Sequence, residues 1–289
     1  MDYKINNITI IIILYEEDSS IVFRCLNNIK NFKIIIVDNA GNINLKKKVE
    51  ENYKIFKYIL NNKNYGVSKG FNQAIYYCET EYFLTLQADC IISTKDILLL
   101  LDTHEKYKDC FITSPTFYDK DLVLSYNGGC LPENTKEIEI LNLEGDTCVE
   151  TVSTAAILMK KKDIIKLGMF DEIFFIYFLD FEICRRILAL KKSVIQVFLA
   201  KNQHVHGDLK VKNIMKKTFI RNYYFTLDEL CYFFKVNKHH SIFLKLKKKI
   251  PNYIIKSITS IFLLKPSKCI YYFARVMAFY KFKKIIKNK

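Results

Sequence analysis

Strand-length apolar runs alternate with amphipathic segments over the first hundred residues. The runs at 8–15 and 34–37 are continuous and rich in β-branched residues, which is typical of strands buried on both faces. Shorter strands are predicted at 56–60 and 82–86. Helix periodicity is found between these strands, near 20–30, near 43–53 and up to about residue 78. Because strand and helix alternate four times, we predict an α/β fold whose central sheet is mostly parallel, with right-handed crossovers.

The pattern changes after residue 110. It is irregular to about 160, with turn signals at 127–129 and 131–134, and two short strands are expected there. A short helix is predicted at 161–167, a second at 180–190 and a strand at 193–199. Beyond 211 the sequence is helical, with predicted breaks near Lys238, at Pro251 and at Pro266.

Polar residues follow several of the predicted strands directly. Tyr15, Asp38 and Asp89 stand at or just after the carboxyl ends of the strands that precede them. In parallel α/β sheets, ligands bind in the crevice beyond these ends. The pattern therefore predicts that these three side chains converge on one ligand site.

Positive charge is concentrated in the last third of the chain. The net charge of the protein is +15, and residues 201–289 contain 21 Lys and Arg against 3 Asp and Glu. We therefore predict two domains, a near-neutral α/β domain at 1–210 and a basic helical region at 211–289. Such a basic region favours a partner that carries phosphates: an anionic membrane surface, a lipid-linked phosphate or nucleic acid.

Cysteine usage and the start of the chain indicate the compartment. Nine cysteines are scattered singly, without a CxxC pair, so we expect neither a disulfide framework nor a zinc site. The first residues do not read as a signal peptide, and no uncharged stretch reaches 18 residues. A cytoplasmic location, peripheral on the inner face of the cell membrane, is expected.

The segment from Gly168 to Arg186 sets acidic groups in an aromatic stretch. A carboxylate there costs several kcal/mol unless its lost hydration is compensated. Asp180 is therefore either held in an ion pair with Arg185 or Arg186, or kept as a base over a substrate.

Four further positions suit ligand chemistry, each with a plain alternative. Asp38 is placed to accept hydrogen bonds from a ligand or to cap a turn. The glycine-punctuated loop at 64–72 suits backbone approach to a phosphate, or is an ordinary turn and helix cap. Asp89 suits Mg²⁺ or Mn²⁺, which prefer oxygen ligands, or is an ordinary loop aspartate. His204 and His206 are candidates for a metal-side nitrogen, or are solvated loop residues.

Taken in order, these motifs resemble the family 2 glycosyltransferases with a GT-A fold, in particular their bacterial rhamnosyltransferase-like branch. The match runs over roughly residues 8–210. The motifs are Ile-Val-Asp-Asn at 36–39, Asn-x-Gly-x-x-x-Gly-x-Asn at 64–72, Leu-Gln-Ala-Asp at 86–89, Gly-x-Phe-Asp-Glu-x-Phe-Phe-x-Tyr from 168, Asp-x-Glu-x-Cys-Arg from 180 and His-x-x-Gly from 204.

The resemblance implies a role for each matched residue. Asp180 corresponds to the catalytic base, and Asp89 and His204 to the metal side, with Mg²⁺ or Mn²⁺ as cofactor. The residues expected on the donor side are Tyr15, Asp38, Asn64, Gly66, Lys69, Asn72 and Gln87. Those expected on the acceptor side are Asp171, Glu172 and Glu182.

The chain departs from the family pattern at two acidic positions. Gln87 stands where the first acid of the metal motif is usual, and Leu179 stands where a glutamate usually precedes the base. An inactive glycosyltransferase-like protein is therefore an alternative to the enzyme. A basic nucleic-acid-binding α/β protein is a second alternative, although no nucleic-acid-binding signature is found.

The predicted enzyme is an inverting, metal-dependent glycosyltransferase. It would move a sugar from dTDP-rhamnose or a UDP-sugar to a glycan or lipid-linked acceptor in cell-surface polysaccharide synthesis. Basic residues at 245–249 and in 271–284 alternate with aromatic and aliphatic ones, which is typical of a surface that docks on anionic lipid.

Overall fold

A computed structural model describes residues 2–126, 128–134, 144–205, 213–237 and 239–287. The described chain divides into two compact units. The first contains residues 2–172 and 179–205, and the second contains Ile173–Phe178 together with the C-terminal helices. The sequence does not predict that the short segment Ile173–Phe178 groups with the C-terminal helices. The functional division at residue 210 stays a prediction.

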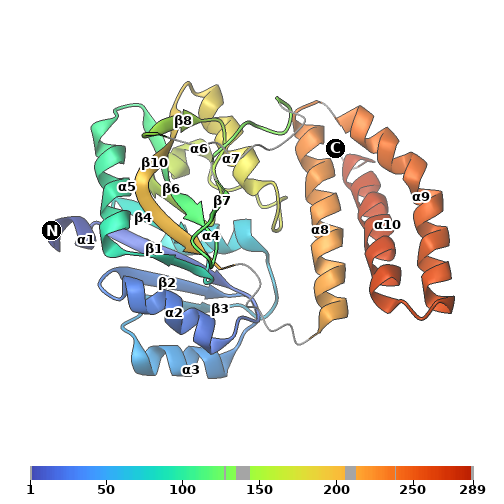
Figure 1. Ribbon diagram of the computed structural model, residues 1–289, viewed down its shortest axis with the longest axis horizontal. Coiled ribbons are helices and arrows are strands. Elements are labelled where there is room, and N and C mark those ends of the chain that lie inside the picture. The colour runs from blue at the N-terminus through green and yellow to red at the C-terminus, as the bar shows by residue number, and fades with distance from the viewer. Residues whose placement is uncertain (1, 127, 135–143, 206–212, 238, 288–289) are drawn as a thin grey trace. The chain divides into compact units, whose positions relative to one another are not determined.

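The first unit is built on one ten-stranded sheet (Figure 1). Its strands are β1 Ile8–Leu14, β2 Lys33–Asp38, β3 Lys57–Leu60, β4 Tyr82–Leu86, β5 Cys90–Ile92, β6 Cys110–Tyr118, β7 Leu124–Tyr126, β8 Thr147–Val149, β9 Ala156–Lys160 and β10 Ser193–His204. Its helices are α1 Asp2–Asn6, α2 Ser19–Ile29, α3 Ile43–Asn52, α4 Val67–Tyr77, α5 Thr94–Lys106, α6 Lys161–Leu167 and α7 Leu179–Ala189.

The strand order is β3-β2-β1-β4-β9-β6-β10-β5, with β7 on β6 and β8 on β10. β1 to β4 are parallel to one another, as the alternation of strand and helix predicts. The rest of the sheet is mixed, because β9 enters antiparallel between β4 and β6. The α/β class is confirmed, and the parallel part of the sheet is smaller than expected.

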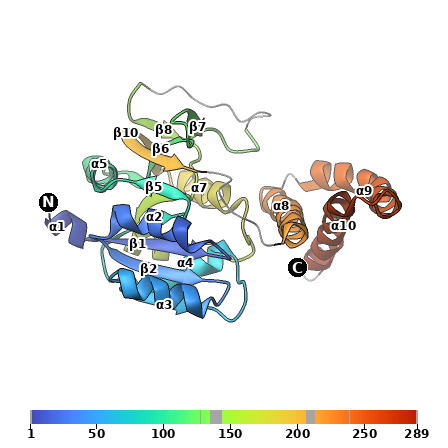
Figure 2. The same ribbon diagram turned by 60° about the horizontal axis from the view of Figure 1, so that its bottom comes forward.

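Helices cover both faces of this sheet (Figure 2). On one face, Ile8, Ile10, Ile12 and Leu14 of β1 belong to a core that also contains the buried residues of α2, α3 and α5. On the other face α4 packs on β1, where a Cβ on Gly70 would lie 3.0 Å from Ile13 Cδ1. Because β1 is buried on both faces, its run of isoleucines needs no alternation.

The second unit contains three long helices, α8 Ile214–Lys235, α9 His239–Phe262 and α10 Pro266–Lys287. The predicted break at Pro251 is wrong, because α9 continues through it. Leu246, Ile250, Ser257 and Ser260 lie on either side of the proline and are all buried. Packing of this stripe compensates for the backbone hydrogen bond that proline cannot make. Pro266 begins α10, a position that proline favours.

Over the described residues, no helix is both long enough and apolar enough to cross a membrane.

Candidate active site

The carboxyl edge of the parallel strands holds the first cluster of predicted site residues. Leu14 of β1 pairs in register with Asp38, the last residue of β2, and the Asn39 N–H donates to the Leu14 carbonyl at 2.8 Å. Tyr15 therefore follows β1 next to Asp38. The predicted convergence of these two strand ends is seen in the structure.

Asp38 is buried, and both carboxylate oxygens accept hydrogen bonds from the protein. The Ala40 N–H donates to Oδ1 at 2.8 Å, while the Asn42 N–H and the Tyr58 hydroxyl donate to Oδ2, each at 3.2 Å. These contacts are those of a turn cap, the plain alternative considered for this residue. Contact of Asp38 with a nucleotide base stays a prediction.

Asn39 joins this strand end to the glycine loop. Its side-chain amide donates to the Gly66 carbonyl at 3.0 Å, and its Oδ1 accepts from the amide of Asn61 at 2.8 Å. Asn64 in turn accepts from the Gly66 N–H at 2.9 Å. Gly66 has a φ of +85°, a conformation that favours glycine, and it directly precedes α4. The loop and the end of β2 are thus one connected structure.

Asp89 and His204 are brought together by the pairing of β10 with β5. The two strands are antiparallel, with His204 opposite Cys90, and the Val205 N–H donates to the Asp89 carbonyl at 3.0 Å. His204 Nε2 consequently lies 3.2 Å from Asp89 Oδ1. The two residues are 115 positions apart in the sequence, so only the sheet explains their contact.

A divalent cation fits these two residues. Side-chain ligand atoms of Asp89, Cys90 and His204 lie within 4.8 Å of one another, and the Asp89 side chain is 17% exposed. Burial raises the pKa of the Cys90 thiol well above its usual value, so this sulfur stays protonated and is a poor ligand for a hard cation. Asp89 and His204 supply the oxygen and nitrogen atoms suited to Mn²⁺. Exposed Gln87 begins the turn that carries Asp89.

Glu17 is a further acidic residue near the strand ends, and sequence reasoning missed it. Its carboxylate accepts a hydrogen bond from the Tyr15 N–H. Burial raises the pKa of Glu17 to about 7, and the negative charges of Asp38 and Asp89 add to the shift. Glu17 therefore lies within electrostatic range of both aspartates. The sequence signal was an acid three residues after a buried strand, which is too common to single out.

Predicted donor-side and acceptor-side residues meet at the start of α4. The Asn72 side chain donates to the Phe170 carbonyl at 2.8 Å and accepts from the Phe170 N–H at 3.0 Å. Glu172 accepts from the same amide at 3.2 Å and pairs with Lys69 Nζ at 3.3 Å. Asn72 thus holds the Gly-x-Phe-Asp-Glu segment, which includes half-buried Asp171, against the glycine loop helix.

Asp180 lies in the first turn of α7, half-buried, and accepts a hydrogen bond from the Phe181 N–H at 3.0 Å. Burial raises the pKa of Asp180 to about 6, while backbone hydrogen bonds oppose the shift. The arginine clamp that was the alternative for this residue is found on Glu182 instead. The convergence of Asp180 with Asp38 and Asp89 stays a prediction.

Glu182 is buried and forms an ion pair with Arg186, with Nη2 at 2.9 Å from its Oε2. The same guanidinium donates to the Leu167 carbonyl at 2.8 Å and to the Met169 carbonyl at 2.7 Å. This arrangement fixes α7 to the end of α6. Because the carboxylate of Glu182 is used inside the fold, we do not carry its predicted acceptor-side role further.

Removing this clamp tests its structural role. Arg186→Ala is expected to lower the free energy of unfolding by about 3–5 kcal/mol, because it removes the cation that compensates the buried Glu182 carboxylate. Urea denaturation measures the change. Lys47→Ala removes an exposed pair with Glu51 at 4.0 Å and is the matched control, with an expected change below about 0.5 kcal/mol. Equal effects of the two variants would contradict the clamp.

Asp228 of α8 was also missed. Its buried carboxylate accepts hydrogen bonds from the N–H groups of Phe175, Ile176 and Tyr177, at 2.9–3.3 Å, and Phe175 stacks on Tyr224. Burial raises the pKa of Asp228 to about 7, against these three donors. The segment that Asp228 holds leads directly into α7. A clue was present in the sequence, since Asp228 is one of only three acids after residue 200.

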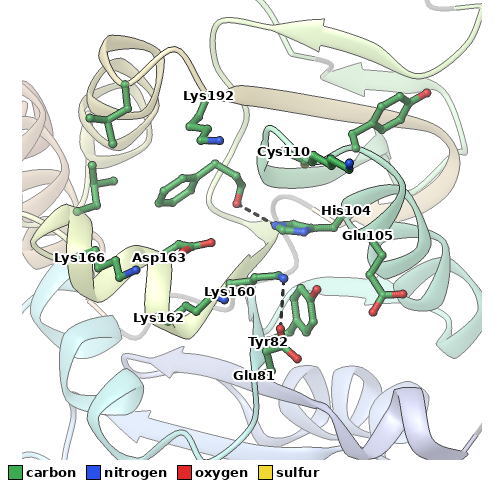
Figure 3. A pocket seen from close by; sticks show the side chains of 15 residues that line it. Glu81, Tyr82, His104, Glu105, Cys110, Lys160, Lys162, Asp163, Lys166 and Lys192 are labelled. Atoms are coloured by element: carbon green, nitrogen blue, oxygen red, sulfur yellow. Dashed lines mark hydrogen bonds and ion pairs between the residues drawn. The ribbon is translucent and has the colours of Figure 1, made fainter.

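A pocket of about 860 Å³ lies at the opposite edge of the sheet (Figure 3). Tyr82 and Cys110, which begin β4 and β6, line it together with Lys160, the last residue of antiparallel β9. His104 lies in its wall, with Nε2 3.3 Å from the Phe111 carbonyl. None of the predicted site residues lines this pocket. We therefore do not assign this pocket as the donor site, although it is large enough for a ligand.

His206 lies outside the described residues, so the choice between His204 and His206 rests on the Asp89 contact of His204 alone.

The fold is of the GT-A type found in glycosyltransferases. The chain is similar in fold to GalNAc-T7, solved with UDP, GalNAc and Mn²⁺, with a TM-score of 0.57 and 13% identity over 78% of this chain and 51% of that chain. It thus spans about half the length of GalNAc-T7. The mannosyltransferase PcManGT from Pyrobaculum calidifontis, solved with GDP-Man and Mn²⁺, matches with a TM-score of 0.55 and 10% identity over 96% of this chain and 86% of that chain.

The chain belongs to glycosyl transferase family 2, which its residues 9–165 match. It is 27% identical over 230 residues to the dTDP-rhamnosyl transferase RfbF of Shigella flexneri, covering 76% of this chain and 77% of that protein. It is 24% identical over 181 residues to the rhamnosyltransferase WbbL of Escherichia coli K12, covering 55% and 67% respectively. The predicted family and its rhamnosyltransferase-like character are confirmed.

Proposed function

We propose that this chain is an inverting glycosyltransferase that takes a sugar from a nucleotide-sugar donor, with dTDP-rhamnose the first candidate and a UDP-sugar the second. The acceptor is a glycan or lipid-linked glycan of cell-surface polysaccharide synthesis. The observation that carries the proposal is the contact between Asp89 and His204 at the strand edge that also holds Asp38 and Glu17. The similarity to RfbF and WbbL supports rhamnose as the transferred sugar.

Asp89 and His204 would hold Mg²⁺ or Mn²⁺ on the donor side. Such an ion supplies positive charge to a leaving diphosphate. Tyr15, Asp38 and Asn64 would line the nucleotide. Gly66, in the loop before α4, and Gln87, in the turn after β4, would flank the nucleotide. Lys69, at the first turn of α4, offers a second positive charge at a helix N-terminus, where backbone N–H groups favour anions.

Asp180 would remove a proton from the acceptor hydroxyl as that oxygen attacks the anomeric carbon. The bond from the anomeric carbon to the diphosphate oxygen breaks on the opposite face, so the configuration inverts. A carboxyl with a pKa of about 6 is ionised at neutral pH and is still a stronger base than an ordinary aspartate. Asp171 and Glu172 are on the segment that precedes Asp180 and would contact the acceptor.

Donor binding tests the proposal directly. Thermal stability is measured with dTDP-, UDP- and GDP-sugars, each with and without Mn²⁺ or Mg²⁺. A ligand at about 100 times its dissociation constant stabilises the folded state by about 2.7 kcal/mol, which gives a clear rise in melting temperature. We expect the largest metal-dependent rise with dTDP-rhamnose. Absence of metal-dependent stabilisation by every donor would contradict the proposal.

We also propose that the enzyme works at an anionic membrane surface, where a lipid-linked acceptor is found. The basic C-terminal helices support this location, because each Lys or Arg near an anionic surface contributes about 1 kcal/mol.

A further inference from the structure

The turn between α9 and α10 exposes four large apolar residues in a row. Ile261, Phe262, Leu263 and Leu264 are 59%, 81%, 62% and 88% exposed. The turn is visible at the lower right of Figure 1, where α9 ends and α10 begins. Single exposed apolar residues are ordinary in proteins, but a contiguous group marks a binding surface.

The apolar surface continues along the outer side of α9. Ile254, Ile255 and Ile258 are 39–59% exposed and follow helical spacing toward the turn. The inner side of the same helix is a separate stripe, since Leu246, Ile250, Ser257 and Ser260 are buried. The exposed isoleucines are therefore not part of the stripe that the helix buries against its own unit. We call residues 254, 255, 258 and 261–264 the apolar tip.

The structure also corrects which apolar residues accompany the lysines. The sequence predicts that the apolar residues among the lysines face lipid, namely Phe243, Leu244, Leu246, Tyr253, Ile254 and Ile255. Phe243 instead stacks on Phe279 at 5.0 Å and Leu246 is buried, so these two residues point into the helical unit. Ile254 and Ile255 are exposed as expected, and the apolar tip extends from them to the turn at 261–264.

The turn is well formed and carries a backbone cost. The Leu263 N–H donates to the Thr259 carbonyl at 3.0 Å, and the Lys265 N–H to the Ser260 carbonyl at 2.8 Å. Leu264 has a φ of +51°, a left-handed conformation that glycine or asparagine adopts at lower cost. In water the exposed Leu264 side chain does not offset the cost of this backbone conformation. Burial of the side chain in an apolar medium would offset it.

Positive charge surrounds the apolar tip. Lys256, Lys265 and Lys268 are exposed beside it, and Lys245 and Lys247–Lys249 precede it on the same helix. Neither α9 nor α10 contains an aspartate or a glutamate. Apolar side chains at the end of a helix with lysines behind them match the interface of an anionic bilayer, where acyl chains lie beneath negative headgroups.

We propose that the apolar tip inserts into the headgroup and acyl-chain boundary of an anionic lipid bilayer, with the lysines of α9 and the turn contacting the phosphates. This inference rests on the membrane location proposed above and names the residues that make the contact. Nucleic acid would engage the lysines but would leave the isoleucines and leucines in water, so it explains only half of the surface.

Vesicle flotation tests the insertion with a matched control. Phe262→Ser with Leu264→Asn removes two apolar side chains from the tip, and asparagine suits the left-handed backbone at 264. Leu122→Asn with Val123→Ser is the control, since Leu122 is 70% exposed with a φ of +59° and Val123 is 59% exposed in the first unit. With phosphatidylcholine vesicles containing phosphatidylglycerol, we expect the tip variant to bind at least about tenfold more weakly and the control to bind like the wild type.

Fluorescence gives a second readout, which reports whether the tip itself enters the bilayer. The chain contains no tryptophan, so Phe262→Trp introduces a single reporter at the tip. Its emission is expected to shift to the blue and to be quenched by brominated lipid on vesicle addition. Tyr76→Trp, at a residue 77% exposed on α4, is expected to show neither change.

Three results would overturn the proposal. The first is equal vesicle binding by the wild type and the tip variant, which leaves lysine attraction alone. The second is a wild-type dimer that the tip variant loses, without any vesicle binding, which makes the tip an interface between copies of the chain. The third is binding to RNA but not to vesicles. Flotation needs no sugar donor, so it tests the membrane contact separately from glycosyl transfer. A wild-type protein that does not hydrolyse any nucleotide-sugar donor would count against glycosyl transfer and not against insertion of the tip. The tip variant is expected to hydrolyse donor like the wild type.

Discussion

Asp180→Asn is expected to reduce turnover by at least about 10²-fold while donor affinity stays nearly unchanged. A positioned general base contributes about 10²–10⁴-fold, and an amide cannot accept the proton of the acceptor hydroxyl. Asparagine keeps the oxygen that accepts the Phe181 N–H, so the start of α7 is preserved. Turnover is measured as nucleotide release in the presence of acceptor, and donor affinity by thermal shift.

The same variant is expected to be more stable than the wild type at pH 8. The pKa of Asp180 in the folded chain is about 6, against 3.8 for an ordinary aspartate. A carboxyl whose pKa is raised by folding favours the folded state below about pH 4, and this contribution is lost as the pH rises through 6. At pH 8 the shift corresponds to about 1–3 kcal/mol of lost stability, which asparagine does not incur. Urea denaturation at pH 4 and pH 8 measures the difference.

Wild-type turnover should follow the same group. We expect it to rise between about pH 5 and pH 7 and to level off above, because the base must be ionised. Asp163→Asn is the matched control and is expected to keep the turnover of the wild type. Asp163 is also a half-buried aspartate in the first turn of a helix, but it lies at the opposite edge of the sheet. An Asp180→Asn enzyme with ordinary turnover would exclude Asp180 as the base.

Asp89→Ala is expected to remove the additional stabilisation that Mn²⁺ gives to donor binding and to lower turnover by about 10²–10³-fold. The variant loses the only carboxylate of the Asp89, Cys90 and His204 group, and a catalytic metal contributes several kcal/mol to charge stabilisation. The melting temperature is measured with donor, over a titration of Mn²⁺.

Cys90→Ala separates this role from a general effect on the β5–β10 pairing. Its thiol is buried and protonated, so its removal should leave the metal-dependent shift intact although overall stability falls. If Asp89→Ala retained the full shift at saturating Mn²⁺, the metal would have to be held elsewhere.

The part of the site on β1 to β4 could be predicted from the sequence. The runs at 8–14 and 33–38 are buried almost completely, so their ends are visible as abrupt changes to polar residues. Strands that are parallel and linked by helices end at one edge, which places Tyr15, Asp38 and the glycine loop together. Only local pattern and chain direction are needed for this inference.

The remaining contacts depend on pairings that local patterns do not encode. His204 reaches Asp89 because β10 is longer than predicted and runs antiparallel to β5. Arg186 selects Glu182 rather than Asp180 because of the i,i+4 geometry of α7 and the two carbonyls at the end of α6. Asp228 reaches residues 175–177 across about fifty positions of sequence. Each of these contacts is set by tertiary packing.

A crystal structure with dTDP and Mn²⁺ decides between the two edges of the sheet. We expect the diphosphate beside Asp89 and His204, the base beside Tyr15 and Asp38, and the carboxylate of Asp180 facing the position of the sugar. Nucleotide bound instead in the lysine-lined pocket around Tyr82 and Lys160, with Asp89 and His204 free of metal, would contradict the assignment of the active site.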